Sequence, residues 1–230
     1  MLTLLWITGI ALIIIPQIWV RGVLNKYSNE PSSVGKTGAE IARDILNRHG
    51  LNKVTVEVTQ RGGDHYDPTA KAVRLSDNFY HGTSLSAVTV AAHECGHAIQ
   101  DAENYGFMKL RAALAPVIQI CQFGPTLLVF SIMLTAFLAS PIWKMTAMIG
   151  LLMYIGIFFF QVITLPVELD ASFARAVPVL EGSGYISHDE KENAKKILQA
   201  CAFTYVAAAL FSLIEILRWA LILFSNRNRN

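Results

Sequence analysis

Hydrophobic positions along the chain form long uncharged runs separated by polar stretches. Residues 2–20 carry no charge and match the length of about 20 apolar residues that a membrane-spanning helix needs. Residues 112–143 are also uncharged, and residues 144–167 carry only Lys144. Because Pro141 lies near the junction of these two runs, the pattern predicts a helical hairpin that crosses a membrane twice.

A fourth run, residues 197–224, contains one charged pair near its end. Glu215 and Arg218 are one helical turn apart, so they can neutralise each other within or beside a bilayer. The pattern therefore predicts a mainly α-helical integral membrane protein with about four transmembrane helices. These are expected at residues 2–20, 112–143, 144–167 and 197–224.

Two polar stretches, residues 21–111 and 168–196, lie outside these runs. The hairpin between them crosses the membrane an even number of times, so both stretches are expected on the same side. Lysine and arginine are concentrated beside them, at Arg21, Lys26, Lys109, Arg111, Arg175, Lys191, Lys195 and Lys196, compared with Lys144, Arg227 and Arg229 on the other side. By the positive-inside rule, this asymmetry predicts a multi-pass protein of the cell membrane with a cytoplasmic domain.

The first polar stretch has the pattern of a small α+β domain. Thr37 and Glu40 form a capping box that starts a helix, and Gly50 can end that helix. Valines alternate with polar residues over 54–59, which predicts a strand with one buried face. A second strand is expected at 72–75.

Two further helices are expected around the polar stretches. One begins near Ser84, whose side chain can cap it. Another is predicted to begin at Pro166 and to end before Pro178. Ser187 and Glu190 form a second capping box, which starts the helix into the last span.

The helix that follows Ser84 carries the sequence H-E-x-x-H at residues 93–97. His93 and His97 are four residues apart and share one helix face, so both imidazoles can reach one zinc ion. Glu94 then lies beside the metal, where a carboxylate can take a proton from water and pass it to a leaving amine. Without a metal, an apolar helix that buries two histidines and a glutamate would leave polar groups unpaired. The alternative is a pair of core histidines whose hydrogen bonds are satisfied by main-chain carbonyls. The motif predicts a zinc site with Glu94 as the catalytic residue.

A catalytic zinc usually needs a third protein ligand and one open position. Glu168 is the main candidate because it directly follows the third uncharged run, just as the motif helix precedes the second. Its alternative role is that of a carboxylate at the membrane edge, which either extends toward water or pairs with Arg175, about two helical turns away. Asp170 is expected to orient a ligand histidine, and it is the second candidate for the third ligand.

Composition excludes several other classes. Of 230 residues, 53% are hydrophobic and 16% are charged, against about 25% charged in soluble domains. The net charge of +2 leaves no dense basic stripe, so no nucleic-acid partner is expected. Cys95, Cys121 and Cys201 are too few and too scattered for a disulfide framework. Cys95 is expected to pack away from the metal.

Residues 64–68 precede the motif helix and could form either a turn or part of a substrate-binding site. Asp67 before a proline is typical of an Asx turn, and such a cluster is more often turn chemistry than a binding site. His65 and Tyr66 are candidates for substrate contact or for a transition-state donor. An exposed edge of the predicted strand 72–75 could pair with an extended substrate through main-chain hydrogen bonds.

Seven stretches of the chain closely resemble the YugP-like neutral zinc metallopeptidases of bacterial membranes. They are NKYS (25–28), TGAEIAR (37–43), DHYDP (64–68), VRLS (73–76), VAAHECGHAIQ (90–100), LPVELDAS (165–172) and TYVAAAL (204–210). The resemblance implies zinc at His93 and His97, with Glu94 catalytic. A more distant similarity is to membrane peptidases related to the heat-shock protease HtpX and the CaaX-type prenyl protease, whose third zinc ligand matches Glu168. In those relatives an aspartate often follows four residues later, where this chain has Ser172.

These observations predict a membrane zinc metalloendopeptidase with a small zincin-like α+β domain at the membrane surface. Its expected cofactor is Zn²⁺, and its expected site is His93, His97 and Glu168 as metal ligands with Glu94 as general base. Its expected partners are the lipid bilayer and an unfolded or membrane-proximal peptide, cut near the cytoplasmic face. The alternative is a non-catalytic membrane scaffold or chaperone-like protein in which zinc has only a structural role and holds the domain together.

Overall fold

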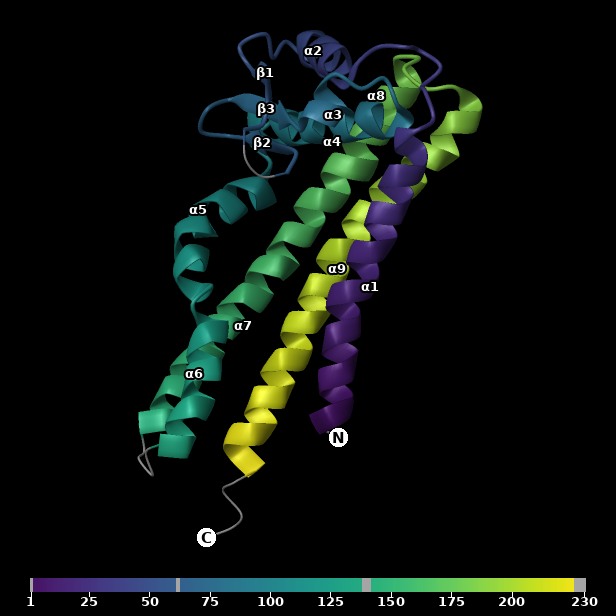
Figure 1. The fold of residues 1–230 in the computed structure, drawn as a ribbon. Coiled ribbons are helices and arrows are strands. Elements are labelled where there is room, and N and C mark those ends of the chain that lie inside the picture. The colour runs from purple at the N-terminus through teal and green to yellow at the C-terminus, as the bar shows by residue number, and fades with distance from the viewer. Residues whose placement is uncertain (1, 61–62, 138–141, 226–230) are drawn as a thin grey trace. The chain divides into compact units, whose positions relative to one another are not determined.

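The computed structural model describes residues 2–60, 63–137 and 142–225 (Figure 1). The chain divides into two compact units. The helical unit comprises 1–15, 110–164 and 205–230, and the mixed unit comprises 16–109 and 165–204. Pro141, at the predicted hairpin turn, lies outside the described residues.

Four helical stretches among the described residues are long and apolar enough to cross a membrane, which agrees with the predicted number. They are Thr3–Ser28, Gly106–Met133, Ile142–Gly182 and His188–Phe224. The first lies in α1 (Leu2–Ser28) and the last in α9 (His188–Ser225). The second combines α5 (Gly106–Cys121) with α6 (Gly124–Phe137), and the third begins with α7 (Ile142–Leu169).

Within the helical unit, α6 and α7 pack closely against each other. A Cβ atom at Gly124 would lie 3.0 Å from the Gly150 carbonyl oxygen, and one at Gly150 would lie 3.0 Å from that of Gly124. Small residues at these two positions therefore let the two backbones approach, as in membrane helix pairs. The buried cluster beside them consists of Leu128, Ala147, Leu151, Tyr154 and Trp219. Arg218 donates to Glu215 within α9, which confirms the predicted neutralising pair.

The helices of the mixed unit begin at the predicted caps. In α2 (Gly38–Arg48), the Thr37 amide donates to Glu40 (2.8 Å) and the Glu40 amide donates to the Thr37 hydroxyl (3.2 Å). The Ser84 hydroxyl caps α4 (Leu85–Ala102) by accepting from the Ala87 amide (3.2 Å).

The second capping box, at the start of α9, is present as well. The Ser187 amide donates to Glu190 (2.6 Å) and the Glu190 amide donates to the Ser187 hydroxyl (3.3 Å). Glu190 also accepts from the Ser33 hydroxyl (2.5 Å), so the same carboxylate joins the loop after α1 to the start of α9.

The sheet has three strands, one more than predicted. They are β1 (Thr55–Val58), β2 (His65–Asp67) and β3 (Ala72–Leu75), in the order β1-β3-β2. β1 runs parallel to β3, and β2 runs antiparallel to it. The predicted Asx turn is confirmed, since Asp67 accepts from the amides of Thr69 (2.9 Å) and Ala70 (3.0 Å).

One prediction about these strands is wrong. β3 is the central strand and is paired on both sides, so it offers no free edge to a substrate. The predicted strand of alternating valines is present as β1. Val54, directly before it, is buried and Val56 packs against the core, whereas Val58 is 37% exposed.

The chain after α7 also differs from the prediction. No helix begins at Pro166, because α7 continues through it to Leu169 and passes directly into a π-helix, Asp170–Ala176. The sequence around Pro166 contains no glycine or asparagine that could end the helix. The short helix α8 (Val177–Gly182) follows.

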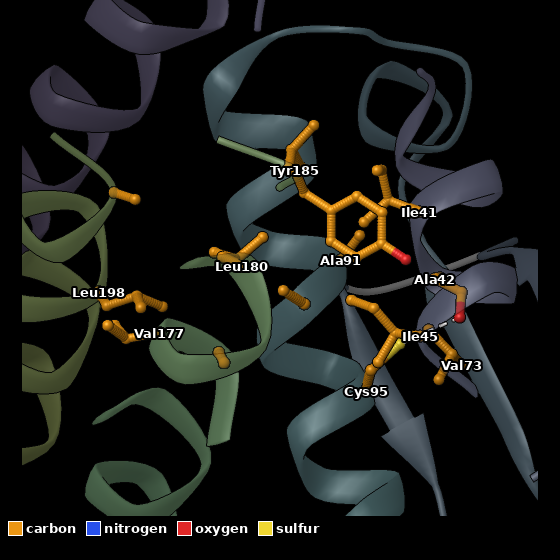
Figure 2. Close-up of a cluster of buried hydrophobic side chains, with 14 of the residues drawn as sticks. Ile41, Ala42, Ile45, Val73, Ala91, Cys95, Val177, Leu180, Tyr185 and Leu198 are labelled. Atoms are coloured by element: carbon orange, nitrogen blue, oxygen red, sulfur yellow. Dashed lines mark hydrogen bonds between the residues drawn. The ribbon is translucent and has the colours of Figure 1, made fainter. Parts of the chain in front are cut away.

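The core of the mixed unit surrounds α4 (Figure 2). It combines side chains of α2, β3, α4, α8, the loop before α9 and the first part of α9, including Ile41, Ile45, Val73, Ala91, Cys95, Leu180, Tyr185 and Leu198. The Cys95 side chain packs here as predicted, and its thiol donates to the Ala42 carbonyl oxygen (3.5 Å). The short helix α3 (Asp77–Tyr80) links the sheet to α4.

Candidate metal centre

The two histidines of the motif lie on one face of α4. Their spacing places the rings one turn apart, with centroids 4.7 Å from each other. The helix is fixed on its other faces by buried apolar side chains, so its register is set by the core. His97 is 7% exposed, and His93 is only slightly more accessible.

Glu168, at the end of α7, faces both histidines. Its Oε2 lies 3.3 Å from His93 Nε2 and 3.4 Å from His97 Nε2, and the side chain is almost fully buried. One ligand atom from each of the three residues falls within 4.8 Å of the others. Among the described residues, this is the group that could hold a metal ion.

The donor set fits zinc. Two imidazole nitrogens and one carboxylate oxygen are the ligands of many catalytic zinc sites, which keep a fourth position open. Both histidines present Nε2 toward Glu168, while each Nδ1 has its own protein partner. Those partners are Gln100 Oε1 for His97 (3.0 Å) and Ser172 Oγ for His93 (3.1 Å). Such outer hydrogen bonds are the usual support of metal-binding histidines.

Asp170 contacts a neighbour of the ligand histidines and not the histidines themselves. It accepts from Gln100 Nε2 (2.7 Å) and from Arg175 Nε (2.6 Å), so it reaches His97 only through Gln100. Arg175 pairs with Asp170 and with Glu103 (2.8 Å), not with Glu168. The geometry therefore favours Glu168 over Asp170 as the third ligand.

Glu94 is buried beside the two histidines, with 6% of its surface exposed. Burial is the largest cause that raises the pKa of Glu94, to about 7, and nearby Glu168 and Asp64 act in the same direction. His93 and the main-chain N–H of Tyr66 lower the pKa of Glu94 and partly offset this rise. A carboxylate with a pKa near neutrality can both take and return a proton at neutral pH.

The π-helix after Glu168 packs against the motif helix at Gly96. A Cβ atom at this position would lie 2.7 Å from the Ala171 carbonyl oxygen, so any side chain would push the two helices apart. A π-helix presents its residues at a wider spacing than an α-helix and often occurs at functional sites. Here it places Ser172 against His93 while Glu168 faces the shared metal position.

Sequence reasoning missed the roles of Gln100, Ser172 and Gly96. One signal was present: Gln100 is three residues after His97 and therefore on the same helix face. The contacts of Ser172 and Gly96 depend on the π-helix, which the chain pattern does not reveal.

Of the two substrate-contact candidates, Tyr66 has its side chain engaged elsewhere. Its hydroxyl donates to Asp101 (2.7 Å), which also accepts from Lys71 (2.5 Å). Tyr66 thus ties β2 to the end of α4. The His65 ring lies with Nδ1 2.9 Å from the Gly63 carbonyl oxygen.

The chain has the features of a helical metalloprotein with a zinc site. These are a helix with the sequence H-E-x-x-H, a glutamate that faces its two histidines, and four long apolar helices. The chain belongs to the family described as "Putative neutral zinc metallopeptidase", whose model matches residues 2–224. It is 43% identical over 218 residues to "Putative membrane protease YugP" of Bacillus subtilis (strain 168), an alignment that covers 93% of this chain and 92% of that protein. No solved structure matches the chain. The family resemblance is therefore confirmed, and zinc is the metal that this site accommodates.

Proposed function

We propose that the protein is a membrane-embedded zinc metalloendopeptidase with a zincin-like catalytic domain. The observation that carries this proposal is the convergence of His93 Nε2, His97 Nε2 and Glu168 Oε2 beside the buried Glu94 carboxylate. The family to which the chain belongs and the printed name of its B. subtilis relative support the same activity.

In the proposed mechanism, His93, His97 and Glu168 hold the metal. Bound zinc supplies Lewis acidity, which polarises a peptide carbonyl and makes water more acidic. Glu94 takes a proton from the attacking water and returns it to the leaving amine. Burial suits Glu94 to this role because it raises the pKa of Glu94 to about 7, the range in which proton uptake and release are balanced.

The substrate is proposed to bind along β2 instead of β3. Among the described residues, β2 pairs with β3 on one side only, and its Tyr66 N–H is directed to Glu94. An extended chain added to this edge would bind through main-chain hydrogen bonds, which favour unfolded segments over a particular sequence. Broad sequence tolerance follows from this mode of binding.

Cleavage of an unfolded protein tests the activity. The purified chain, in detergent micelles with zinc, is expected to degrade unfolded casein, and a strong chelator should abolish this activity until zinc is restored. The measurement is the release of casein fragments with time. Absence of fragments from the zinc-loaded chain, together with unfolding after zinc removal, would instead support the scaffold function.

The mixed unit is proposed to lie in the cytoplasm, close to the membrane surface. The support is the concentration of lysine and arginine beside it and the position of Glu168 within the third candidate span. Asn52 is an exposed residue of this unit and can be replaced by cysteine for labelling. Thr3, an exposed residue near the N-terminal end of α1, can serve as the control position.

A labelling experiment checks this orientation. In a variant with its native cysteines replaced by alanine, Asn52→Cys is expected to stay unlabelled by a membrane-impermeant thiol reagent in intact cells. The Thr3→Cys control should label, and both sites should label after the cells are opened. Labelling of Asn52→Cys in intact cells would place the mixed unit on the outer side.

A further inference from the structure

Gln100 is a fully buried polar residue, and its amide contacts one metal-site histidine. Its Oε1 lies 3.0 Å from His97 Nδ1. Its Nε2 donates to the Val167 carbonyl oxygen (2.8 Å) and to Asp170 Oδ2 (2.7 Å). One side chain on α4 therefore touches a ligand histidine and two residues that flank Glu168.

These contacts fix which way the Gln100 amide faces. A carbonyl oxygen and an ionised carboxylate only accept hydrogen bonds, so the NH₂ group must face Val167 and Asp170. Asp170 stays an acceptor because Arg175 Nε donates to the same oxygen (2.6 Å). The Gln100 oxygen must then face His97.

The orientation of Gln100 in turn decides the tautomer of His97. An amide oxygen cannot donate, so the hydrogen bond to Gln100 forms only if His97 Nδ1 carries the proton. The lone pair of the neutral ring is then on Nε2, which is the atom that faces Glu168 at 3.4 Å. His97 is therefore prepared as an Nε2 ligand before any metal arrives.

His93 has a less restrictive partner. Ser172 Oγ can donate or accept, so its hydrogen bond to His93 Nδ1 is compatible with either tautomer. The two histidines of the motif therefore differ. The hydrogen bond to Gln100 allows only one neutral tautomer of His97, whereas the hydrogen bond to Ser172 allows either tautomer of His93.

We propose that Gln100 is the positioning residue that fixes the tautomer and ring orientation of His97, and that Asp170 holds Gln100 in the orientation this requires. The proposal rests on the metal site and not on peptide cleavage. Zinc binding tests it independently of the proposed protease activity.

The first experiment compares Gln100→Met with the matched control Gln199→Met. Methionine keeps the length of the side chain and removes both hydrogen-bonding ends, and Gln199 is an exposed residue of α9. The full chain in detergent micelles is titrated with zinc in competition with a chromophoric chelator. Gln100→Met is expected to weaken zinc binding by about 10- to 100-fold, while Gln199→Met stays at the wild-type Kd.

A double-mutant cycle separates positioning from general damage to the fold. If Gln100 acts through His97, Gln100→Met should cause no further loss of zinc affinity when His97 is already alanine. A zinc Kd of Gln100→Met equal to wild type overturns the proposal. An equal loss in the His97→Ala background overturns it as well.

A charge exchange tests the part played by Asp170. Gln100→Glu places a carboxylate against the Asp170 carboxylate and should weaken zinc binding. Adding Asp170→Asn restores a donor opposite the new carboxylate, so the double variant is expected to bind zinc more tightly than Gln100→Glu alone. A double variant that binds more weakly than the single one shows that Asp170 does not hold Gln100, and overturns that half of the proposal.

Discussion

Glu94→Gln is expected to lower kcat/KM for an unfolded peptide substrate by about 10²- to 10⁴-fold and to leave zinc content unchanged. Glutamine has nearly the same shape but cannot take a proton from water, so only the proton transfer is lost. Glu94 has no place among the three groups that face the metal position, which is why zinc should remain. Peptide cleavage rates and zinc analysis of the same purified sample measure the two quantities.

The control for this prediction is Glu192→Gln, which makes the same chemical change at an exposed position of α9. Its kcat/KM should equal that of the wild type. Cleavage by Glu94→Gln at the wild-type rate would contradict the role of Glu94 as the base and would require another proton acceptor.

Glu168→Ala is expected to have the largest effect on metal content. It removes one of three protein ligands, and two histidines form an incomplete shell. The loss in zinc affinity should therefore exceed the 10- to 100-fold that removal of an outer orienting partner costs. Asp170→Ala, which disturbs His97 only through Gln100, should show that smaller loss.

The order of the two effects decides between the two carboxylates. Zinc stoichiometry and Kd are measured for both variants under one set of conditions. If Asp170→Ala lost zinc and Glu168→Ala retained it, Asp170 would be the third ligand.

Local signals in the sequence predicted the elements that build this site. The capping box at Thr37 and the cap at Ser84 depend on side chains within three residues of the amides they bind, so they can be read directly from the chain. The i, i+4 spacing of His93 and His97 fixes their common face in the same way. The role of Glu168 follows from a longer-range relation, because the two ends of a helical hairpin return to the same side of the membrane.

What the sequence did not reveal depends on contacts between distant segments. β2 has only three residues and pairs through its main chain. Its side chains therefore carry no alternating pattern that would distinguish this short strand from a turn. The central place of β3 follows from that pairing. The helix continues through Pro166 because no stop signal follows it, and the wide turn after Glu168 is stabilised by the close approach to Gly96.

The position of Glu168 in the chain also sets an order of events during synthesis. A ribosome makes His93 and His97 before the second and third candidate spans, and it makes Glu168 only after the second span and most of the third. The nascent chain therefore carries two of its three metal-facing groups first, and the third is made before the third candidate span is complete and before the fourth begins. A chain whose synthesis stops before residue 168 would have an incomplete set of metal ligands. The metal centre can therefore be completed only after the second candidate span and most of the third have been synthesised.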